Sequence, residues 1–273
     1  MLHTVEVTSS QGELLSLPFE DSSSGFAVKD IEGLDPVPAQ LVSSSFANMD
    51  GEQYQSSRRE KRNIIITIRL DPDHSITSVR QLRAHLYNFF MPKSEVGLKF
   101  LMTGETPLLI SGRVETFDAN LFVKEPEATI SIINYNPDFY EEFPILINTA
   151  STTTSDYLTH NYQGTIDTGL TIKVTVTTAM PNGFMVSVRL PGGAVENLQY
   201  NDPLEVGDIL TIVTDRGSKS VEKTSNSITE SFLYKVTPQS AWIRFYPGIN
   251  QIRVQGTGAA LVEVSYTNKY GGL

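Results

Sequence analysis

The sequence predicts a mainly β protein with two domains, of which the first is α+β and the second is an all-β sandwich or jelly roll. Three observations lead to this prediction. Apolar residues alternate with polar ones in short segments along most of the chain, as they do in half-buried strands. Residues 78–90 form the one stretch in which apolar residues recur at helical spacing. A polar run at 150–156 (ASTTTSD) then separates the part with the helix from a part that has strand patterns only.

The best-defined elements of the first domain are one strand and one helix. In residues 64–70 (IIITIRL) every second side chain is aliphatic, so one face of the strand is apolar, and the proline at position 72 ends it. The helix is predicted over 78–90, because Ser78 and Gln81 have the spacing of a capping box. The apolar face of this helix carries Val79, Leu82, Leu86, Phe89 and Phe90.

The rest of the first domain is predicted to consist of antiparallel strands and loops. Strand patterns occur within residues 1–30 and at 97–102, 108–114, 117–123 and 128–134. Gly112 indicates a bulge or a close packing contact in its strand. The segment 49–62, which contains Gly51 and ends in basic residues, is interpreted as a long polar loop.

The polar run at 150–156 predicts the domain junction, somewhere between Pro144 and Gly164. We therefore expect domains at residues 1–146 and 147–273. The second domain has eight strand candidates, at 170–177, 184–190, 209–214, 218–223, 228–234, 241–245, 251–255 and 261–266. Short strands separated by turns rich in Gly, Pro and Asn are typical of a β-sandwich or jelly roll.

The composition argues against several classes of protein. A formal net charge of −10 lacks the basic footprint that a nucleic-acid-binding protein needs. The absence of cysteine excludes disulfides, thiolate metal sites and cysteine catalysis. No apolar segment reaches the roughly 18–20 residues of a membrane span. Residues 1–10 show no secretory signal, so we expect synthesis and assembly in a cytoplasm.

No motif in the sequence predicts catalysis, a metal site or a cofactor. Phosphate-binding loops, dinucleotide fingerprints, nucleophile elbows and zinc-protease motifs are all absent. His74 follows Asp71 and Asp73, so a three-ligand metal site is conceivable there. We favour a solvated turn whose acidic groups precede a helix N-terminus. The sequence therefore predicts no catalytic residue, no metal ligand and no cofactor.

Two groups of residues are candidates for recognition. The dense basic cluster of Arg58, Arg59, Lys61 and Arg62 could contact an acidic protein surface or passing DNA, or it could be the solvated start of a strand. A protein contact is favoured over DNA because the rest of the chain is acidic. Trp242 and Tyr246 could form a platform for sugars, but large aromatic residues more often anchor a core, and we favour that interpretation.

Four segments, taken in order, resemble the siphophage distal tail protein family. They are 31–36 (IEGLDP), 50–54 (DGEQY) followed by the basic cluster and the Ile-rich strand, 136–140 (NPDFY), and 242–250 (WIRFYPGIN). The order and spacing of these segments carry the resemblance, which covers most of the chain.

The resemblance implies a non-enzymatic structural protein of the virion. In this family the first domain forms a ring, typically hexameric, that joins the tail tube to the baseplate and leaves a channel for DNA. The second domain is galectin-like or similar to a carbohydrate-binding module. The implied partners are further copies of the chain, the tail tube protein, a tail-tip protein and receptor-binding proteins. Neither membrane insertion nor sequence-specific nucleic-acid binding is expected.

Two other classes of function remain open from the sequence. The β-sandwich could recognise host-surface glycans, in which case Trp242 or Tyr246 should lie exposed in a concave patch. An enzyme such as a wall-degrading hydrolase has less support, because no acid/base pair or nucleophile is placed by a motif.

Overall fold

The chain forms two compact units. The structure is a computed structural model that describes residues 1–19, 21, 23–48, 50–73, 75–120, 123–150 and 156–273. At residues 148–150 it describes the backbone alone. The first unit comprises Met1–Glu142 and Gly271–Leu273, and the second comprises Phe143–Tyr270. The predicted boundary between residues 146 and 147 falls within strand β11 (Ile145–Ala150) of the second unit. Residues 151–155 of the polar run lie outside the described residues.

The first unit is built on one antiparallel sheet with strand order β2-β1-β7-β8-β9-β6-β3, and β10 pairs with β8. Its strands are β1 (Leu2–Ser9), β2 (Leu14–Pro18), β3 (Phe26–Glu32), β4 (Ala39–Ser44), β5 (Gln53–Arg59), β6 (Arg62–Leu70), β7 (Glu95–Met102), β8 (Leu108–Asn120), β9 (Glu127–Asn134) and β10 (Phe139–Glu141). Strands β4 and β5 form a separate two-stranded sheet. The α+β architecture predicted for the first part of the chain is confirmed.

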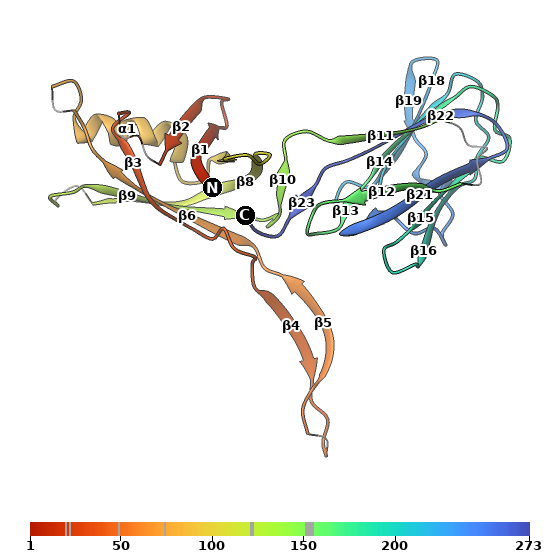
Figure 1. The fold of residues 1–273 in the computed structure, drawn as a ribbon, viewed down its shortest axis with the longest axis horizontal. Coiled ribbons are helices and arrows are strands. Elements are labelled where there is room, and N and C mark those ends of the chain that lie inside the picture. The colour runs from red at the N-terminus through yellow and green to blue at the C-terminus, as the bar shows by residue number, and fades with distance from the viewer. Residues whose placement is uncertain (20, 22, 49, 74, 121–122, 151–155) are drawn as a thin grey trace. The chain divides into compact units, whose positions relative to one another are not determined.

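Helix α1 (Val79–Phe90), the single α-helix among the described residues of the first unit, covers one face of this sheet (Figure 1). Its N-terminus carries the predicted capping box, since the Ser78 hydroxyl accepts from the Gln81 N–H and the Gln81 side chain accepts from the Ser78 N–H. The helix buries Leu82, Leu86, Phe89 and Phe90. Val79, which was expected to be buried, is only half-buried because it lies in the first turn.

Strand β8 corrects the prediction of two separate strands at 108–114 and 117–123. It is continuous from Leu108 to Asn120, and a register shift between Val114 and Thr116 marks an irregularity in its pairing with β9. Gly112 serves close packing, because a Cβ there would lie 2.5 Å from the Asn134 side-chain nitrogen. The residues at 121–122 lie outside the described part.

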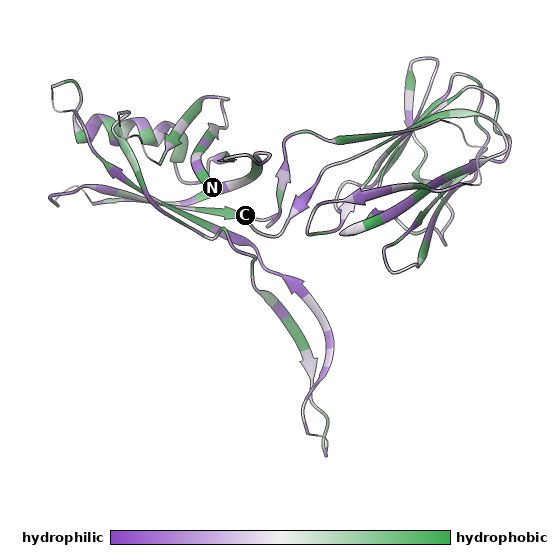
Figure 2. Cartoon of the chain, in the orientation of Figure 1, coloured by the Kyte–Doolittle hydropathy of each residue, from purple (hydrophilic) through white to green (hydrophobic). Residues whose placement is uncertain are grey.

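Within the expected polar loop at 49–62, residues 53–59 instead form strand β5, which pairs with β4 in a β-hairpin. The two strands pair from Ala39 with Arg59 to Ser44 with Gln53. Figure 1 shows the hairpin as a two-stranded arm. In Figure 2 β5 has hydrophilic and neutral colours, whereas β4 contains a hydrophobic stretch. The strands were not predicted because every residue of β5 is exposed, so no alternation of apolar residues marks it.

The second unit consists of a six-stranded sheet, ordered β11-β22-β14-β17-β18-β19, and a four-stranded sheet, ordered β12-β21-β15-β16. Strands β13 and β20 form a further two-stranded pair. Beyond β11, its elements are β12 (Leu158–Tyr162), β13 (Thr168–Gly169), β14 (Thr171–Val176), β15 (Phe184–Arg189), β16 (Val195–Tyr200), β17 (Ile209–Val213), β18 (Ser220–Ser225), β19 (Ile228–Ser231), the 3-10 helix η1 (Leu233–Lys235), β20 (Arg244–Phe245), β21 (Gly248–Gly256), β22 (Ala260–Tyr266) and β23 (Lys269–Tyr270). The predicted eight did not include β11, β12, β13, β16 or β23, and the expected strand at 241–245 is reduced to the two residues of β20.

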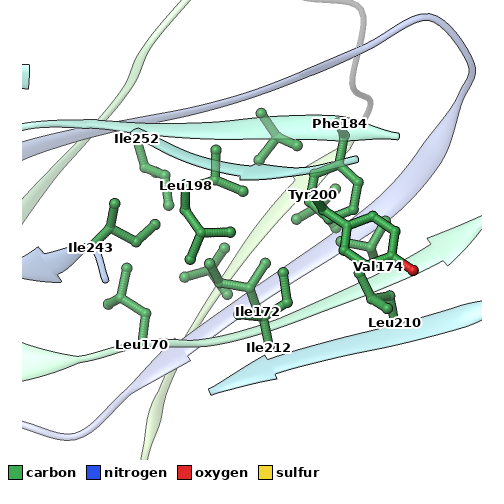
Figure 3. Packing of buried hydrophobic residues seen from close by; sticks show 14 of the residues in the cluster. Leu170, Ile172, Val174, Phe184, Leu198, Tyr200, Leu210, Ile212, Ile243 and Ile252 are labelled. Carbon is green, nitrogen blue, oxygen red and sulfur yellow. The ribbon is translucent and has the colours of Figure 1, made fainter. Parts of the chain in front are cut away.

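A single apolar core fills the space between the two sheets of the second unit. Figure 3 shows side chains from both sheets meeting in it, among them Ile172 and Ile212 from the larger sheet and Leu198 and Ile252 from the smaller. All four are at most 1% exposed. The predicted class, a mainly β chain whose second part is an all-β sandwich, is confirmed by this arrangement.

Two features of the described part bear on its function. None of its helices is long and apolar enough to span a membrane. No group of three His, Asp or Glu side chains in the same residues is placed to hold a metal ion. His74, the centre of the conceivable metal site, lies outside the described residues.

Candidate subunit interface

The basic cluster lies at the base of the β4–β5 hairpin, and the structure gives its four members different roles. Arg58 is exposed, and its Nε donates to the Gln40 side chain across the hairpin at 2.8 Å. Lys61 is exposed in the short connection to β6 and has no hydrogen bond or ion pair with any described residue. These two cations therefore face solvent and are available to a partner.

Arg59 forms an ion pair with an acidic residue of its own unit. Its two terminal nitrogens bind the two carboxylate oxygens of Asp138, with Nη2 to Oδ2 at 3.1 Å. The Asp138 side chain is 11% exposed and that of Arg59 is 38% exposed. Such a forked pair fixes the orientation of both groups. Arg59 thus attaches the end of β5 to the segment before β10.

Arg62 is buried at 1% exposure and faces the interior of the first unit. Its Nε donates to the Pro137 carbonyl at 2.8 Å, and its guanidinium lies 4.4 Å from the centre of the Phe139 ring. The remaining hydrogen bonds run from Nη1 to the carbonyls of Gly33 at 2.5 Å and Asp35 at 2.7 Å, and from Nη2 to that of Gly271 at 2.5 Å. Burial lowers the pKa of Arg62, and Asp138 opposes this effect.

The structure thus brings Arg59 and Arg62 together with residues that sequence reasoning did not connect to them. Asp138 and Phe139 belong to the NPDFY segment, and the carbonyls of Gly33 and Asp35 belong to the IEGLDP segment. The two motifs therefore meet at the base of the hairpin. No spacing in the sequence could have revealed this, because the acceptors are mainly backbone carbonyls far apart in the chain.

One face of the hairpin carries two large side chains that are uncovered within the described chain, alongside serines. Leu41 pairs with Ser57, and Tyr54 pairs with Ser43, so the alternation of the strands places Leu41 and Tyr54 on the same face. Their exposed fractions are 68% and 61%. A two-stranded hairpin without other support is marginally stable in water. Arg58 pairs with Gln40, next to Leu41, and so lies on the opposite face of the hairpin. We therefore regard the hairpin as a whole, with Leu41 and Tyr54 on one face and with Arg58 and Lys61 at its base, as the candidate interface.

The structure places Trp242 and Tyr246 at partly buried positions in the second unit. Trp242 is partly buried and packs against the core of the sandwich, and the Lys219 ammonium lies 5.1 Å from the centre of its ring. Tyr246 is also partly buried, and its backbone begins a tight turn. Between them, Phe245 is fully buried.

Asn250 holds the turn that follows Tyr246. The Asn250 side chain is fully buried; it accepts from the Tyr246 N–H at 3.1 Å and donates to the carbonyls of Tyr246 at 2.7 Å and Gly248 at 2.9 Å. Gly248 has φ = 101°, a conformation that side chains disfavour. The YPGIN segment is therefore a side-chain-capped turn at the start of β21.

We expect Asn250→Ala to lower the free energy of unfolding of the second unit by about 2–3 kcal/mol. The reason is that three backbone groups of the turn would lose the buried side chain that binds them. Trp242 is the one tryptophan of the chain and lies in this unit, so its fluorescence in a denaturant titration measures the effect. Asn197→Ala, at an exposed position of strand β16, is the control, for which a change below about 0.5 kcal/mol is expected. Equal effects of the two substitutions would contradict the capping role.

Buried acids in the second unit are paired in ways that favour structural roles. Burial raises the pKa of Asp208, but hydrogen bonds from Lys223, Ser225 and the Glu205 N–H outweigh this and lower it overall. The Lys223 ammonium lies 2.8 Å from the Asp208 carboxylate and joins the start of β17 to β18. A general acid requires a raised pKa instead. The contacts and the lowered pKa of Asp208 therefore favour a structural role over that of an acid catalyst.

Comparison with known proteins gives one family and a set of similar folds. Residues 163–270 match the family model described as the siphovirus-type tail component, C-terminal domain. The crystal structure of the Dit protein of phage SPP1, described as a paradigm of the hub adsorption apparatus in phages infecting Gram-positive bacteria, aligns with a TM-score of 0.73. The two are 15% identical, over 97% of this chain and 98% of that one.

A baseplate protein of phage P2 also aligns, over the whole of both chains, with 9% identity and a TM-score of 0.48, which is too low to support an argument. No curated protein matches the chain. The resemblance to the siphophage distal tail proteins is thus confirmed, in sequence over residues 163–270 and in fold over nearly the whole chain.

Proposed function

We propose that the protein is a structural component of a siphophage tail tip, acting as the hub that joins the tail tube to the baseplate. The observation that carries this proposal is the family match of the second unit, together with the SPP1 Dit fold of the chain. The protein would be located in the virion and assembled in the host cytoplasm. Its partners would be the tail tube protein, a tail-tip protein and receptor-binding proteins.

The hub would be a closed ring, typically of six copies, around a channel for DNA. Two features support self-association of the first unit. Its sheet ends in the open edge strands β2 and β3, whose unpaired backbone groups can accept another strand. A head-to-tail contact closes into a ring when the rotation per copy divides a full turn. The net charge of −10 would let DNA pass without adhering.

The β4–β5 hairpin would reach the neighbouring copy. Leu41 and Tyr54 supply exposed apolar surface that a contact would remove from water. Arg58 and Lys61 supply cations that match the acidic balance of the chain. Arg59 and Arg62 would take part indirectly, because their side chains are bound within their own copy and hold the hairpin in place.

The double variant Arg58→Glu/Lys61→Glu tests this interface. We expect the purified variant to remain folded, because both side chains are exposed, and to lose self-association at concentrations at which the natural chain assembles. Analytical ultracentrifugation over a concentration series measures the loss. The matched control is Arg80→Glu/Lys124→Glu, which makes the same change of charge at exposed positions away from the hairpin.

Assembly of the hairpin variant with unchanged affinity would refute the role of Arg58 and Lys61. Because the tail tube could be required to start the ring, the same two variants should also be compared by incorporation into tails. A hub role predicts that the control variant is incorporated and the hairpin variant is not.

A further inference from the structure

The buried guanidinium of Arg62 gathers three segments that are far apart in the sequence, and one of them is the segment that follows the second unit in the chain. We propose that Gly271–Leu273 form a strap that fixes the base of the β4–β5 hairpin, so that the position of these three residues controls how rigidly the hairpin is held. The strap and the hairpin base both belong to the first unit.

The strap is attached at each of its three residues. The Gly271 carbonyl accepts from Arg62 Nη2 at 2.5 Å, and the Leu273 N–H donates to the Leu34 carbonyl at 3.0 Å. Between them, Gly272 packs so closely that a Cβ would lie 2.9 Å from Pro36 Cδ and 3.1 Å from the Leu34 oxygen. Only a glycine fits here without displacement of a neighbour.

The same contacts hold both ends of the hairpin. On the incoming side, residues 33–36 lead into β4, and they bind both Arg62 and the strap. On the outgoing side, β5 ends at Arg59 and the chain reaches Arg62 three residues later. The Glu60 N–H also bonds to the Pro38 carbonyl at 3.1 Å. Loss of the strap would therefore loosen both the segment that leads into the hairpin and the segment that leaves it.

Because Arg62 is buried, the base of the hairpin depends on the strap. A buried charged donor needs all its acceptors, because an unsatisfied N–H in the interior is costly. If the strap leaves, Arg62 Nη2 loses its acceptor and the residues at 33–36 lose their cover. Water would then enter the base, and the hairpin would sample more orientations.

The chain leaves the second unit at Tyr270 and enters the strap at the next residue. A pull or rotation that a partner exerts on the second unit would thus act directly on the base of the hairpin through the covalent chain. The consequence for ring assembly rests on the proposed function. The coupling between strap and hairpin does not, and it can be tested on the isolated protein.

The test is Gly272→Val in the full chain, whose added side chain would expel the strap. The chain contains no cysteine, so spin labels can be attached to Ser56→Cys on the hairpin and Arg80→Cys on the helix, both exposed positions in the first unit. Electron paramagnetic resonance then measures the distribution of distances between the labels. Gly192→Val is the matched control, since a Cβ there meets nothing within 4 Å.

We expect Gly272→Val to accelerate hydrogen exchange of the Leu273 amide by about tenfold or more, which reports release of the strap. The distance distribution should broaden in this variant and remain narrow in Gly192→Val. A released strap with an unchanged distribution would overturn the proposal. Retained protection of Leu273 in Gly272→Val would also overturn it, because the tight packing of Gly272 would be refuted.

Discussion

Arg62→Leu is expected to lower the free energy of unfolding of the first unit by about 3–5 kcal/mol, which is among the largest effects of any substitution in the chain. The substitution leaves four backbone carbonyls without the donor that now binds them, at a site where the guanidinium is 1% exposed. Removing one partner from a buried charged network typically costs this amount. It also removes the stacking on Phe139.

The measurement is a denaturant titration followed by helical circular dichroism, because α1 is the only α-helix of the described chain and lies in the first unit. Arg62→Lys should be intermediate, since a lysine keeps the charge but cannot reproduce the planar fork. Arg58→Leu, at an exposed position, is the control and should change stability by less than about 0.5 kcal/mol. If Arg62→Leu is as stable as the control, the structural role of Arg62 is wrong.

Leu82→Ala is the substitution with the second large expected effect, and it should lower the free energy of unfolding of the first unit by about 2–5 kcal/mol. The side chain is 6% exposed, on the face of α1 that covers the sheet, and it packs so closely to Gly25 that a Cβ on that glycine would lie 2.9 Å away. Its removal would leave a cavity that the surrounding sheet cannot easily close.

Val79→Ala is the informative comparison, because both positions lie on the apolar face of the helix. Val79 is only half-buried, so its replacement removes little buried apolar surface. Alanine has the higher helix propensity, and this gain should nearly offset the stability lost with the valine side chain. Helical circular dichroism in a denaturant series should therefore separate the two variants clearly. A similar loss of stability in the two variants would show that the first turn of α1 is packed against the sheet.

The elements that could be predicted from the sequence are those whose residues reveal their burial locally. Strand β6 has an aliphatic residue at every second position from Ile64, and helix α1 has both a capping box and apolar residues at spacings of three and four. In each case one face packs on the core, so the period of the pattern is imposed by the fold.

The hairpin and its base could not be predicted in this way. Strand β5 has no buried residue, so its conformation depends on pairing with β4 and on contacts at its base. The basic cluster was recognised as a candidate interface, but burial of Arg62 depends on carbonyls contributed by residues 33–35, 137 and 271. A charged residue that binds backbone groups leaves no complementary signal in the sequence.

Strand β16 was missed for a related reason. Only Leu198 and Tyr200 of its six residues are buried, and the polar residues between them resemble a loop. The strand forms because β15 offers it a complete set of backbone partners. Tertiary pairing here outweighs a weak local pattern.

The central claim is that this chain forms the hub ring of a siphophage tail, and electron cryomicroscopy of tail tips from virions that contain the protein tests it most directly. We predict a closed ring of identical copies around the tail axis, with the β4–β5 hairpin of each copy in contact with its neighbour. Tails that assemble without this protein, or virions that carry it away from the tail tip, would contradict the claim.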